Sequence, residues 1–295
     1  MTAKGAAHLV LILFLGGLAA CGPNSQFNAA RKLEKKGKYE RAWEAYQLFA
    51  AKHPKHELAP EALFRAGWLV EKQLKDCFMA QSFYDRVTAY YPQSEPWARA
   101  ASLQKNNCPD YFPLMAGYHW TEVDSDTKGK NARIEISCEP YGPSTKGLPS
   151  DAGALVRVYY AGDKKSYDTR TLFKKTDSEL LEFKSDTDPR SKTVLRWPFT
   201  IGTTWKTKSD NRIFIYEIVS VNVRVSVAAG EFDGCLEVKS TIEGIPGAAT
   251  VEYYAPGVGR VLTAVRTERV EKRVTELASY KVAEFPEIRS GDGKP

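Results

Sequence analysis

Residues Tyr39 to Ala50, which read YERAWEAYQLFA, decide the fold of the first part of the chain. The apolar side chains recur at intervals of three and four residues, at Tyr39, Ala42, Trp43, Tyr46, Phe49 and Ala50. This spacing places them on one face of an α-helix. Gly37 ends the helical stretch before it and Pro54 stops this one, so two helices joined by a short turn are expected. Such a helical hairpin cannot bury its own apolar face.

The same pattern returns further along the chain. Three positions are repeated at a distance of 38 residues, as Ala42, Tyr46 and Pro54 and then as Ala80, Tyr84 and Pro92. The segment 27–107 resembles the tetratricopeptide repeat, a helical hairpin in which small residues lie where helices pack closely. The distance exceeds the usual ~34 residues of that family, which a longer first helix in the second unit would explain.

The subtype resembles the repeats of periplasmic envelope lipoproteins, such as the D component of the outer-membrane β-barrel assembly machine. Known members of that family are scaffolds whose concave groove holds a peptide or a partner domain. The resemblance therefore implies a protein partner in the periplasm. The candidate groove residues are Tyr39, Trp43, Tyr46, Trp68 and Tyr84.

The resemblance also bears on the cysteines. First helices of successive units run parallel in this family, and Cys77 and Cys108 would follow the ends of two such helices. A Cys77–Cys108 disulfide is therefore expected to close the small array. Cys138 and Cys235 then remain and would pair by elimination. Their strand positions face opposite ways, so this second disulfide requires a bulge near Gly234.

The N-terminus has the architecture of a signal peptide. Lys4 is followed by an apolar run over 9–15 and by small residues over 16–20. The run is too short for the ~20 residues of a membrane-spanning helix. Leu18 to Cys21, LAAC, resembles the lipobox of bacterial lipoproteins, in which the cysteine receives a diacylglycerol and becomes the mature N-terminus. An ordinary signal peptide with a coincidental cysteine is the alternative.

The lipobox resemblance implies a location. Residues 1–20 would be removed, and acyl chains such as palmitate on Cys21 would hold the protein stably on a membrane. Gly22 stands where lipoproteins retained in the inner membrane carry chiefly aspartate, which favours the periplasmic face of the outer membrane. Residues 21–26 are then expected to form a polar tether. Loss of Lys4 lowers the formal net charge from +6 to +5, too small a bias to indicate nucleic-acid binding.

Beyond Tyr118 the helical period gives way to short β-branched and aromatic runs separated by turn residues. The nine runs are Arg133–Ser137, Ala154–Tyr160, Tyr167–Phe173, Leu180–Phe183, Arg212–Val221, Cys235–Ile242, Thr250–Tyr254, Arg260–Arg266 and Val270–Val282. This spacing predicts an antiparallel barrel, half-barrel or sandwich over 117–283, followed by a tail over 284–295. The fold class is therefore α+β with two domains.

Three further stretches mark this second domain. They read WPFTIGTTW over 197–205, GEFDGC over 230–235 and YYAPGVGRV over 253–261. They resemble the hallmarks of a family of exported bacterial β domains of unassigned activity. Pro256 and Gly257 suit the two corner positions of a type II turn. The apolar residues of 212–221 fall on both faces, which fits either a strand covered on both sides or a strand that lines a cavity for an apolar ligand such as a lipid.

Residues that carry chemistry are sparse. His53 and His56 have the spacing of a metal pair, but no cysteine or carboxylate framework completes a site. His119 is expected to pack with its aromatic neighbours. No nucleophile elbow, zinc-protease helix or phosphate-binding loop is present. Carboxylates such as Glu135 and Glu139 leave a two-carboxylate hydrolase open as the weakest reading.

We therefore expect a membrane-anchored scaffold of the cell envelope without enzymatic activity, metal or cofactor. The alternative is a module that binds an apolar ligand, such as a lipid, through the β domain. A partner caught in the groove would favour the first, and a hydrophobic cavity in the β domain would favour the second.

Overall fold

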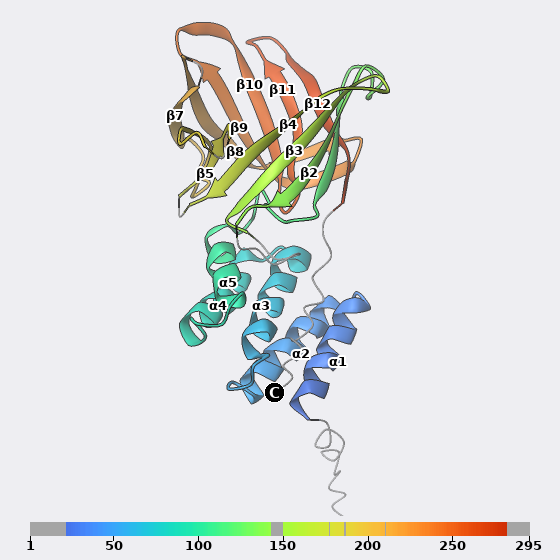
Figure 1. Ribbon diagram of the computed structural model, residues 1–295, viewed down its shortest axis with the longest axis vertical. Coiled ribbons are helices and arrows are strands. Elements are labelled where there is room, and N and C mark those ends of the chain that lie inside the picture. Colours follow the sequence, from blue (N-terminus) through green and yellow to red (C-terminus); the bar gives the residue numbers. More distant parts are fainter. Residues whose placement is uncertain (1–21, 143–149, 177, 186, 210, 282–295) are drawn as a thin grey trace, which may run out of the picture. The chain divides into compact units, whose positions relative to one another are not determined.

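The computed structural model describes residues 22–142, 150–176, 178–185, 187–209 and 211–281. The chain divides into two compact units, Met1–Phe83 and Tyr84–Pro295. Helices precede strands along the chain, as the sequence predicts (Figure 1). The predicted signal peptide, the lipidation site Cys21 and the predicted tail lie outside the described residues.

The helices occupy the first third of the chain. They are α1 (Pro23–Lys35), α2 (Tyr39–Lys52), α3 (Ala59–Leu69), the π-helical turn η1 (Val70–Leu74), α4 (Cys77–Tyr90) and α5 (Trp97–Asn106). Gly37 has a φ of +67°, which allows the chain to turn tightly between α1 and α2. The helix α3 has 11 residues and α1 has 13, and the π-helical turn η1 extends the helical stretch of α3 by five residues.

The apolar stripe of α2 forms the core of the first unit. Ala42, Tyr46, Phe49 and Ala50 are all buried. The Phe27 ring of α1 lies 5.4 Å from the Tyr46 ring and 5.5 Å from the Phe49 ring, measured between centroids. The stripe therefore serves helix packing.

The predicted tether over 21–26 is wrong from Pro23 onward, because α1 begins there. Proline suits the first turn of a helix, where its fixed φ is already helical and its missing N–H has no partner to lose. Phe27 is 2 % exposed and anchors this first turn in the core.

The second unit contains a 12-stranded antiparallel sheet. Its strands are β1 (His119–Asp124), β2 (Ala132–Pro140), β3 (Ala152–Ala161), β4 (Lys164–Lys175), β5 (Glu179–Phe183), β6 (Ser191–Arg196), β7 (Thr204–Ser209), β8 (Arg212–Val227), β9 (Gly230–Ile242), β10 (Ile245–Ala255), β11 (Gly259–Arg266) and β12 (Glu271–Lys281). Eight of the nine predicted runs lie within observed strands. The ninth, 270–282, covers β12 but begins one residue before it and ends outside the described residues, and the sequence does not predict β1, β6 and β7.

The sheet is a nearly closed barrel. Its order is β6-β5-β4-β3-β2-β1-β12-β11-β10-β9-β8-β7, so the two ends of the sheet are β6 and β7, which are neighbours in the sequence. The backbone N–H of Thr193 donates to the Thr207 hydroxyl over 3.3 Å, and the Trp205 indole N–H donates to the Thr193 carbonyl over 3.2 Å. These bonds hold the two edge strands beside each other without a regular ladder.

The segment 107–118, which links α5 to β1, packs against the barrel; we call it the plug. Lys175 of β4 forms a buried 2.7 Å ion pair with the Asp110 carboxylate of the plug. The Gly257 N–H donates to the Asp110 carbonyl over 2.7 Å. The Phe112 ring lies 4.9 Å from the Phe173 ring. The plug is thus fixed at several strands and brings an aromatic ring into the barrel.

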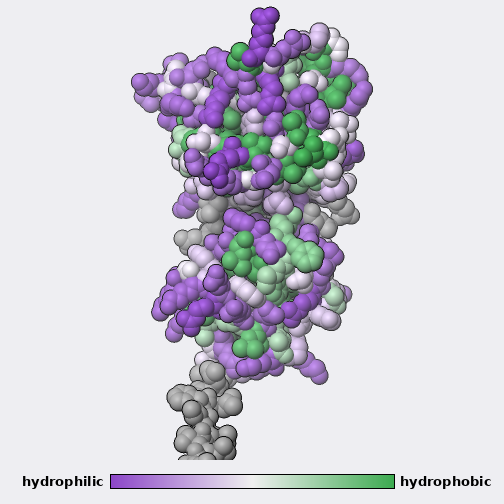
Figure 2. Space-filling view, turned by 180° about the vertical axis from the view of Figure 1, so that it is seen from behind, coloured by the Kyte–Doolittle hydropathy of each residue, from purple (hydrophilic) through white to green (hydrophobic). Residues whose placement is uncertain are grey.

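The turn over 255–258 has the predicted type II features. Gly257 has a φ of +72°, and the Val258 N–H donates to the Ala255 carbonyl over 3.1 Å. On the face shown in Figure 2, hydrophobic residues form patches separated by hydrophilic ones.

The two predicted disulfides have opposite outcomes. The Cys77–Cys108 disulfide is formed. The Cys138–Cys235 disulfide is wrong, because both side chains are buried free thiols. Cys138 lies on β2 and Cys235 on β9, and four strands separate β2 from β9 in the sheet. The positive φ of Gly234 (+68°) therefore cannot bring the two sulfurs together.

Candidate functional site

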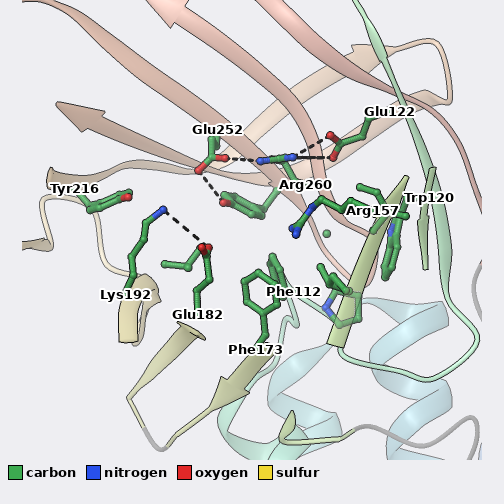
Figure 3. Close-up of a pocket in the computed structure, with 16 residues that line it drawn as sticks. Phe112, Trp120, Glu122, Arg157, Phe173, Glu182, Lys192, Tyr216, Glu252 and Arg260 are labelled. Atoms are coloured by element: carbon green, nitrogen blue, oxygen red, sulfur yellow. Dashed lines mark hydrogen bonds and ion pairs between the residues drawn. The ribbon is translucent and has the colours of Figure 1, made fainter. Parts of the chain in front are cut away.

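The barrel encloses a cavity of about 120 Å³, lined by the plug and by strands from around the sheet (Figure 3). One group of lining residues is apolar and consists of Phe112, Pro113, Trp120, Ile136, Leu155, Phe173 and Val194. A second group is charged and consists of Glu122, Arg157, Glu182, Lys192, Glu252 and Arg260. Tyr216, Tyr254 and Gly259 complete the wall.

Strand alternation explains why these side chains converge. Residues two apart on a strand share a face of the sheet. Leu155 and Arg157 therefore point inward together from β3, and Lys192 and Val194 do so from β6. The register continues the pattern across strands, because Ile136 of β2 lies opposite Arg157.

One side of the cavity holds a network centred on Arg260. Its guanidinium donates to both Glu122 oxygens, at 3.1 and 2.9 Å, and to a Glu252 oxygen at 2.8 Å. The Tyr254 hydroxyl donates to the other Glu252 oxygen over 2.9 Å. One cation therefore faces two carboxylates, which leaves this group with an excess of negative charge.

The electrostatics of this network follow from its pairing. Glu122 raises the pKa of Arg260 far above its ordinary value, against the effect of burial. Burial acts to raise the pKa of Glu252, but Arg260 and the Tyr254 hydroxyl outweigh it and hold that pKa below 4.5. Glu252 is thus ionised at neutral pH.

Lys192 lies on the other side of the cavity. Its ammonium is 3.9 Å from a Glu182 oxygen, and Tyr216 lies nearby in the wall of the same cavity. Burial acts to lower the pKa of Lys192, but Glu182 and Tyr216 raise it overall. The Tyr216 ring stacks on Trp205 at 5.2 Å with an interplanar angle of 6°. Lys192 is therefore held charged beside a rigid aromatic pair.

Arg157 differs from the other two cavity cations. Its guanidinium makes one hydrogen bond to a side chain, a 3.3 Å contact from Nη1 to the Thr171 hydroxyl. Its central carbon lies 5.7 Å from the centroid of the Phe173 ring. Among the described residues, no carboxylate lies within 4.0 Å of it. Burial and the nearby Arg260 lower the pKa of Arg157, as expected for a buried cation without a carboxylate partner.

The predicted groove residues have different surroundings. Tyr46 and Tyr84 are both 0 % exposed, so neither can line an accessible groove. The Tyr46 hydroxyl instead donates to Glu34 over 2.6 Å. These two predictions fail because the repeated aromatic fills the space between helices. Tyr39, Trp43 and Trp68 are partly exposed and remain candidates.

The other sequence-based candidates lie apart from the cavity. His53 contacts Gln26 at 3.2 Å, and His119 is exposed on β1 instead of packing with Tyr118 and Trp120. Within the described ranges, no cluster of three or more His, Cys, Asp or Glu side chains is close enough to hold a metal ion. In the same part of the chain, no helix has the length and apolar character needed to cross a membrane.

The sequence did not identify the charged wall. For the segment 212–221, the sequence leaves open a strand covered on both sides or a cavity lining, and only Tyr216 of this segment is among the lining residues named above. A detectable signal was Arg157, which shares a strand face with the apolar Leu155 and Tyr159. A charged residue in phase with buried apolar neighbours indicates an internal polar contact.

No family model matches the chain, and no curated protein matches it. Two solved structures are similar to part of it. One is a protein from Bacteroides fragilis described as exported and as having a YmcC-like fold, with 16% identity, a TM-score of 0.41, and coverage of 58% of this chain and 98% of that one. The other is a protein from Parabacteroides distasonis described as a lipoprotein, with 14% identity, a TM-score of 0.38 and the same coverage of both chains.

Proposed function

We propose that the β barrel is a binding module for a small amphipathic molecule, within a lipid-anchored, non-catalytic protein of the cell envelope. One observation carries this proposal. The barrel cavity is lined both by aromatic side chains, among them Phe112 and Phe173, and by charged side chains. Binding sites for small molecules combine these two features.

The volume of the cavity supports this reading. A cavity of 120 Å³ holds about four water molecules, at ~30 Å³ each. A ligand whose polar groups replace the hydrogen bonds of these waters can displace them.

The charged lining residues favour an amphipathic ligand over the apolar ligand expected from the sequence. Six charged side chains line the cavity, and a wholly apolar occupant would separate them from water without replacing those contacts. An amphipathic molecule satisfies both parts of the wall. The cavity also limits its size, since ~150 Å³ accommodates a molecule as large as benzene.

Titration of the isotopically labelled mature chain, carrying Cys21→Ser, with small amphipathic molecules tests the module. We expect resonances around the cavity to shift on binding. Leu155→Trp fills the cavity and should abolish the shifts, whereas Val156→Trp, on the opposite face of β3, should preserve them. Absence of binding by every molecule, or equal binding to both variants, contradicts the proposal.

The helical unit supports a second function, the docking of a periplasmic protein partner by a tetratricopeptide-like array. Phe78, in the first turn of α4, is 88 % exposed, and Leu48 is 53 % exposed. An exposed aromatic side chain such as Phe78 can act as an anchor for a protein partner. A photo-crosslinker at Phe78 should capture a protein in intact cells, whereas one at the exposed Ser82 should not. Equal yields at the two positions oppose this function.

We also propose, from the sequence, that lipid attached to Cys21 anchors the protein in the outer membrane. The LAAC stretch, which ends at the first residue of the expected mature chain, supports it. Cys21→Ala should block incorporation of labelled palmitate and leave the protein unprocessed, while the folded units form normally. A processed, membrane-bound Cys21→Ala protein contradicts the anchor.

A further inference from the structure

The three cations of the cavity differ in how fully they are paired. Arg260 uses its Nε, Nη1 and Nη2 atoms on carboxylates. Lys192 faces Glu182 and Tyr216. Arg157 has the hydroxyl of Thr171 and an aromatic face. Of these three, Arg157 is the cation that has no carboxylate partner among the described residues.

The geometry of Arg157 suits an anion. A guanidinium has five N–H donors in a planar fork that matches the two oxygens of a carboxylate. One of these donors is used on Thr171. Figure 3 shows the guanidinium directed into the cavity, near the Arg260–Glu122 pair and Phe112. An oxyanion placed here would form two parallel charge-assisted hydrogen bonds.

The neighbouring charges select for a single negative charge. Glu122 and Glu252 share Arg260, so the adjacent wall carries an excess of negative charge. A phosphate dianion would meet repulsion from these carboxylates, and this repulsion grows with the charge of the ligand. A monovalent carboxylate meets half of that repulsion and keeps the bidentate geometry.

The apolar lining residues and the volume of the cavity define the hydrocarbon part of the ligand. Phe112, Leu155 and Phe173 line the same space as Arg157. A volume of 120 Å³ is slightly below the ~150 Å³ that holds benzene, so it admits about six heavy atoms. A short aliphatic chain attached to a carboxylate fills this space.

We propose that the cavity binds a short-chain monocarboxylate, whose carboxylate is received by the Arg157 guanidinium and whose hydrocarbon contacts Phe112, Leu155 and Phe173. This inference rests on the proposed binding function of the barrel and specifies its ligand class.

The probes are butyrate, the neutral butyramide, the cationic n-butylammonium and inorganic phosphate. Each is titrated at neutral pH into the mature chain carrying Cys21→Ser, and shifts of cavity resonances are followed. We expect butyrate to bind at least tenfold more tightly than each of the other three. Butyramide lacks a charge for the guanidinium, n-butylammonium is repelled by Arg157, and phosphate lacks a hydrocarbon chain. Binding should be lost as the pH falls through the pKa of butyrate itself.

Two variants with a matched control locate the contact. Arg157→Gln should weaken butyrate binding by roughly tenfold to a hundredfold. Arg157→Lys keeps the charge without the fork and should fall between this variant and the parent. Arg170→Gln removes a charge from the opposite face of β4 and should leave the affinity unchanged. The amide spectrum of each variant shows whether it is folded, and an unfolded Arg157→Gln leaves Arg157→Lys to decide.

The outcomes separate the two levels of the proposal. Binding of butyramide as tight as butyrate, or unaltered binding in the folded Arg157 variants, overturns the carboxylate inference while the barrel remains a binding module. Tighter binding of phosphate than of butyrate also overturns it. If no amphipathic probe, charged or neutral, shifts the cavity resonances, the proposed function fails, and the inference fails with it.

Discussion

Each unit of the protein contains one arginine between two glutamates and a tyrosine hydroxyl, and the two groups differ in their access to open space. The helix cluster consists of Glu34, Tyr46, Glu61 and Arg65. The barrel cluster consists of Glu122, Glu252, Tyr254 and Arg260. The side chain of Arg65 is 4% exposed, whereas that of Arg260, which borders the cavity, is 29% exposed.

The difference in exposure indicates a structural role for the helix cluster and allows the barrel cluster to contact a ligand. In the helix cluster, every charge is enclosed by packed helices, and its hydrogen bonds serve to satisfy one another. In the barrel cluster the same groups face a cavity that also contains Arg157. The same set of side chains thus acts as a closed structural unit in one region and as part of a wall that can meet a ligand in the other.

The largest expected effect comes from removing the central arginine of each cluster. Arg65→Gln leaves Glu34 and Glu61 buried without their cation, which should cost about 3–5 kcal/mol in the free energy of unfolding. Arg260→Gln should cost less, about 1–3 kcal/mol, because water in the cavity can solvate Glu122 and Glu252. Hydrogen exchange resolved by unit measures both.

Arg190→Gln is the control for these variants. Its side chain is 87% exposed and pairs with Asp188 on the surface, so its loss should be close to neutral. A larger cost for Arg260→Gln than for Arg65→Gln would mean that the barrel cluster is more enclosed than the helix cluster.

The tyrosine hydroxyls give the second effect. Tyr46→Phe removes a 2.6 Å hydrogen bond to Glu34 and should cost about 1.5–3 kcal/mol, the range for a bond to a charged group. Tyr254→Phe removes a 2.9 Å bond to Glu252, whose other oxygen still meets Arg260. We expect a smaller loss there, measured in the same way. Equal losses indicate that the cavity does not relieve the barrel cluster.

The third effect concerns ligand affinity. Glu122→Gln removes one of the two carboxylates beside Arg260 and makes the cavity more positive, so butyrate should bind more tightly by about 1–2 kcal/mol at an effective dielectric constant of ~20. Calorimetric titration measures this gain. Glu34→Gln makes the same change in the helix cluster and should leave the affinity unaltered. Weaker butyrate binding to Glu122→Gln contradicts the charge argument.

The helices were predictable because their signals are local. The 3-and-4 spacing of α2, the turn at Gly37 and the recurring Ala42 and Tyr46 all depend on neighbouring residues. The face of Tyr46 could also be predicted, but not its full burial. Whether an apolar stripe faces a groove or a neighbouring helix depends on distant parts of the chain.

The missed strands carry weak local signals. β7 reads TWKTKS, in which Trp205 is the only apolar residue, and β6 begins with the polar stretch SKT. Both strands lie at the ends of the sheet, where one side lacks a ladder and fewer apolar residues are required. Long-range closure of the barrel stabilises these strands, and sequence periodicity does not report on it.

The sequence could offer a cavity as one of two alternatives, but it could not name the residues that line it. These residues are brought together by strand register. Glu122, Glu252 and Arg260 come from β1, β10 and β11, and alternation assigns each a face but not its neighbours. Arg157 shares a face with Leu155 and Tyr159, but the other face of ALVRVYY is apolar too, so the sequence does not show which face lines a cavity. Pairing of distant strands decides which charges meet.

The smallest expected difference is the response of the two clusters to acid. Burial raises the pKa of Glu61 above 4.5. The pKa of Glu252 is below 4.5, because Arg260 outweighs the effect of burial. As the pH falls through the raised pKa of Glu61, the native state takes up the proton before the unfolded chain does, so the helical unit gains stability. As the pH falls below 4.5, the unfolded chain takes up the proton at the Glu252 position first, so the barrel loses stability until the lower native pKa is passed.

Free energies of opening from hydrogen exchange, corrected for the intrinsic exchange rate at each pH, test these signs between about pH 6 and pH 4. Glu61→Gln should remove the gain in the helical unit, and Glu252→Gln should remove the loss in the barrel. Each variant is the control for the other, because the two residues belong to different units. A gain of stability in the barrel on acidification would mean that burial outweighs Arg260 at Glu252, so that the cavity wall holds less negative charge and discriminates less against a dianion.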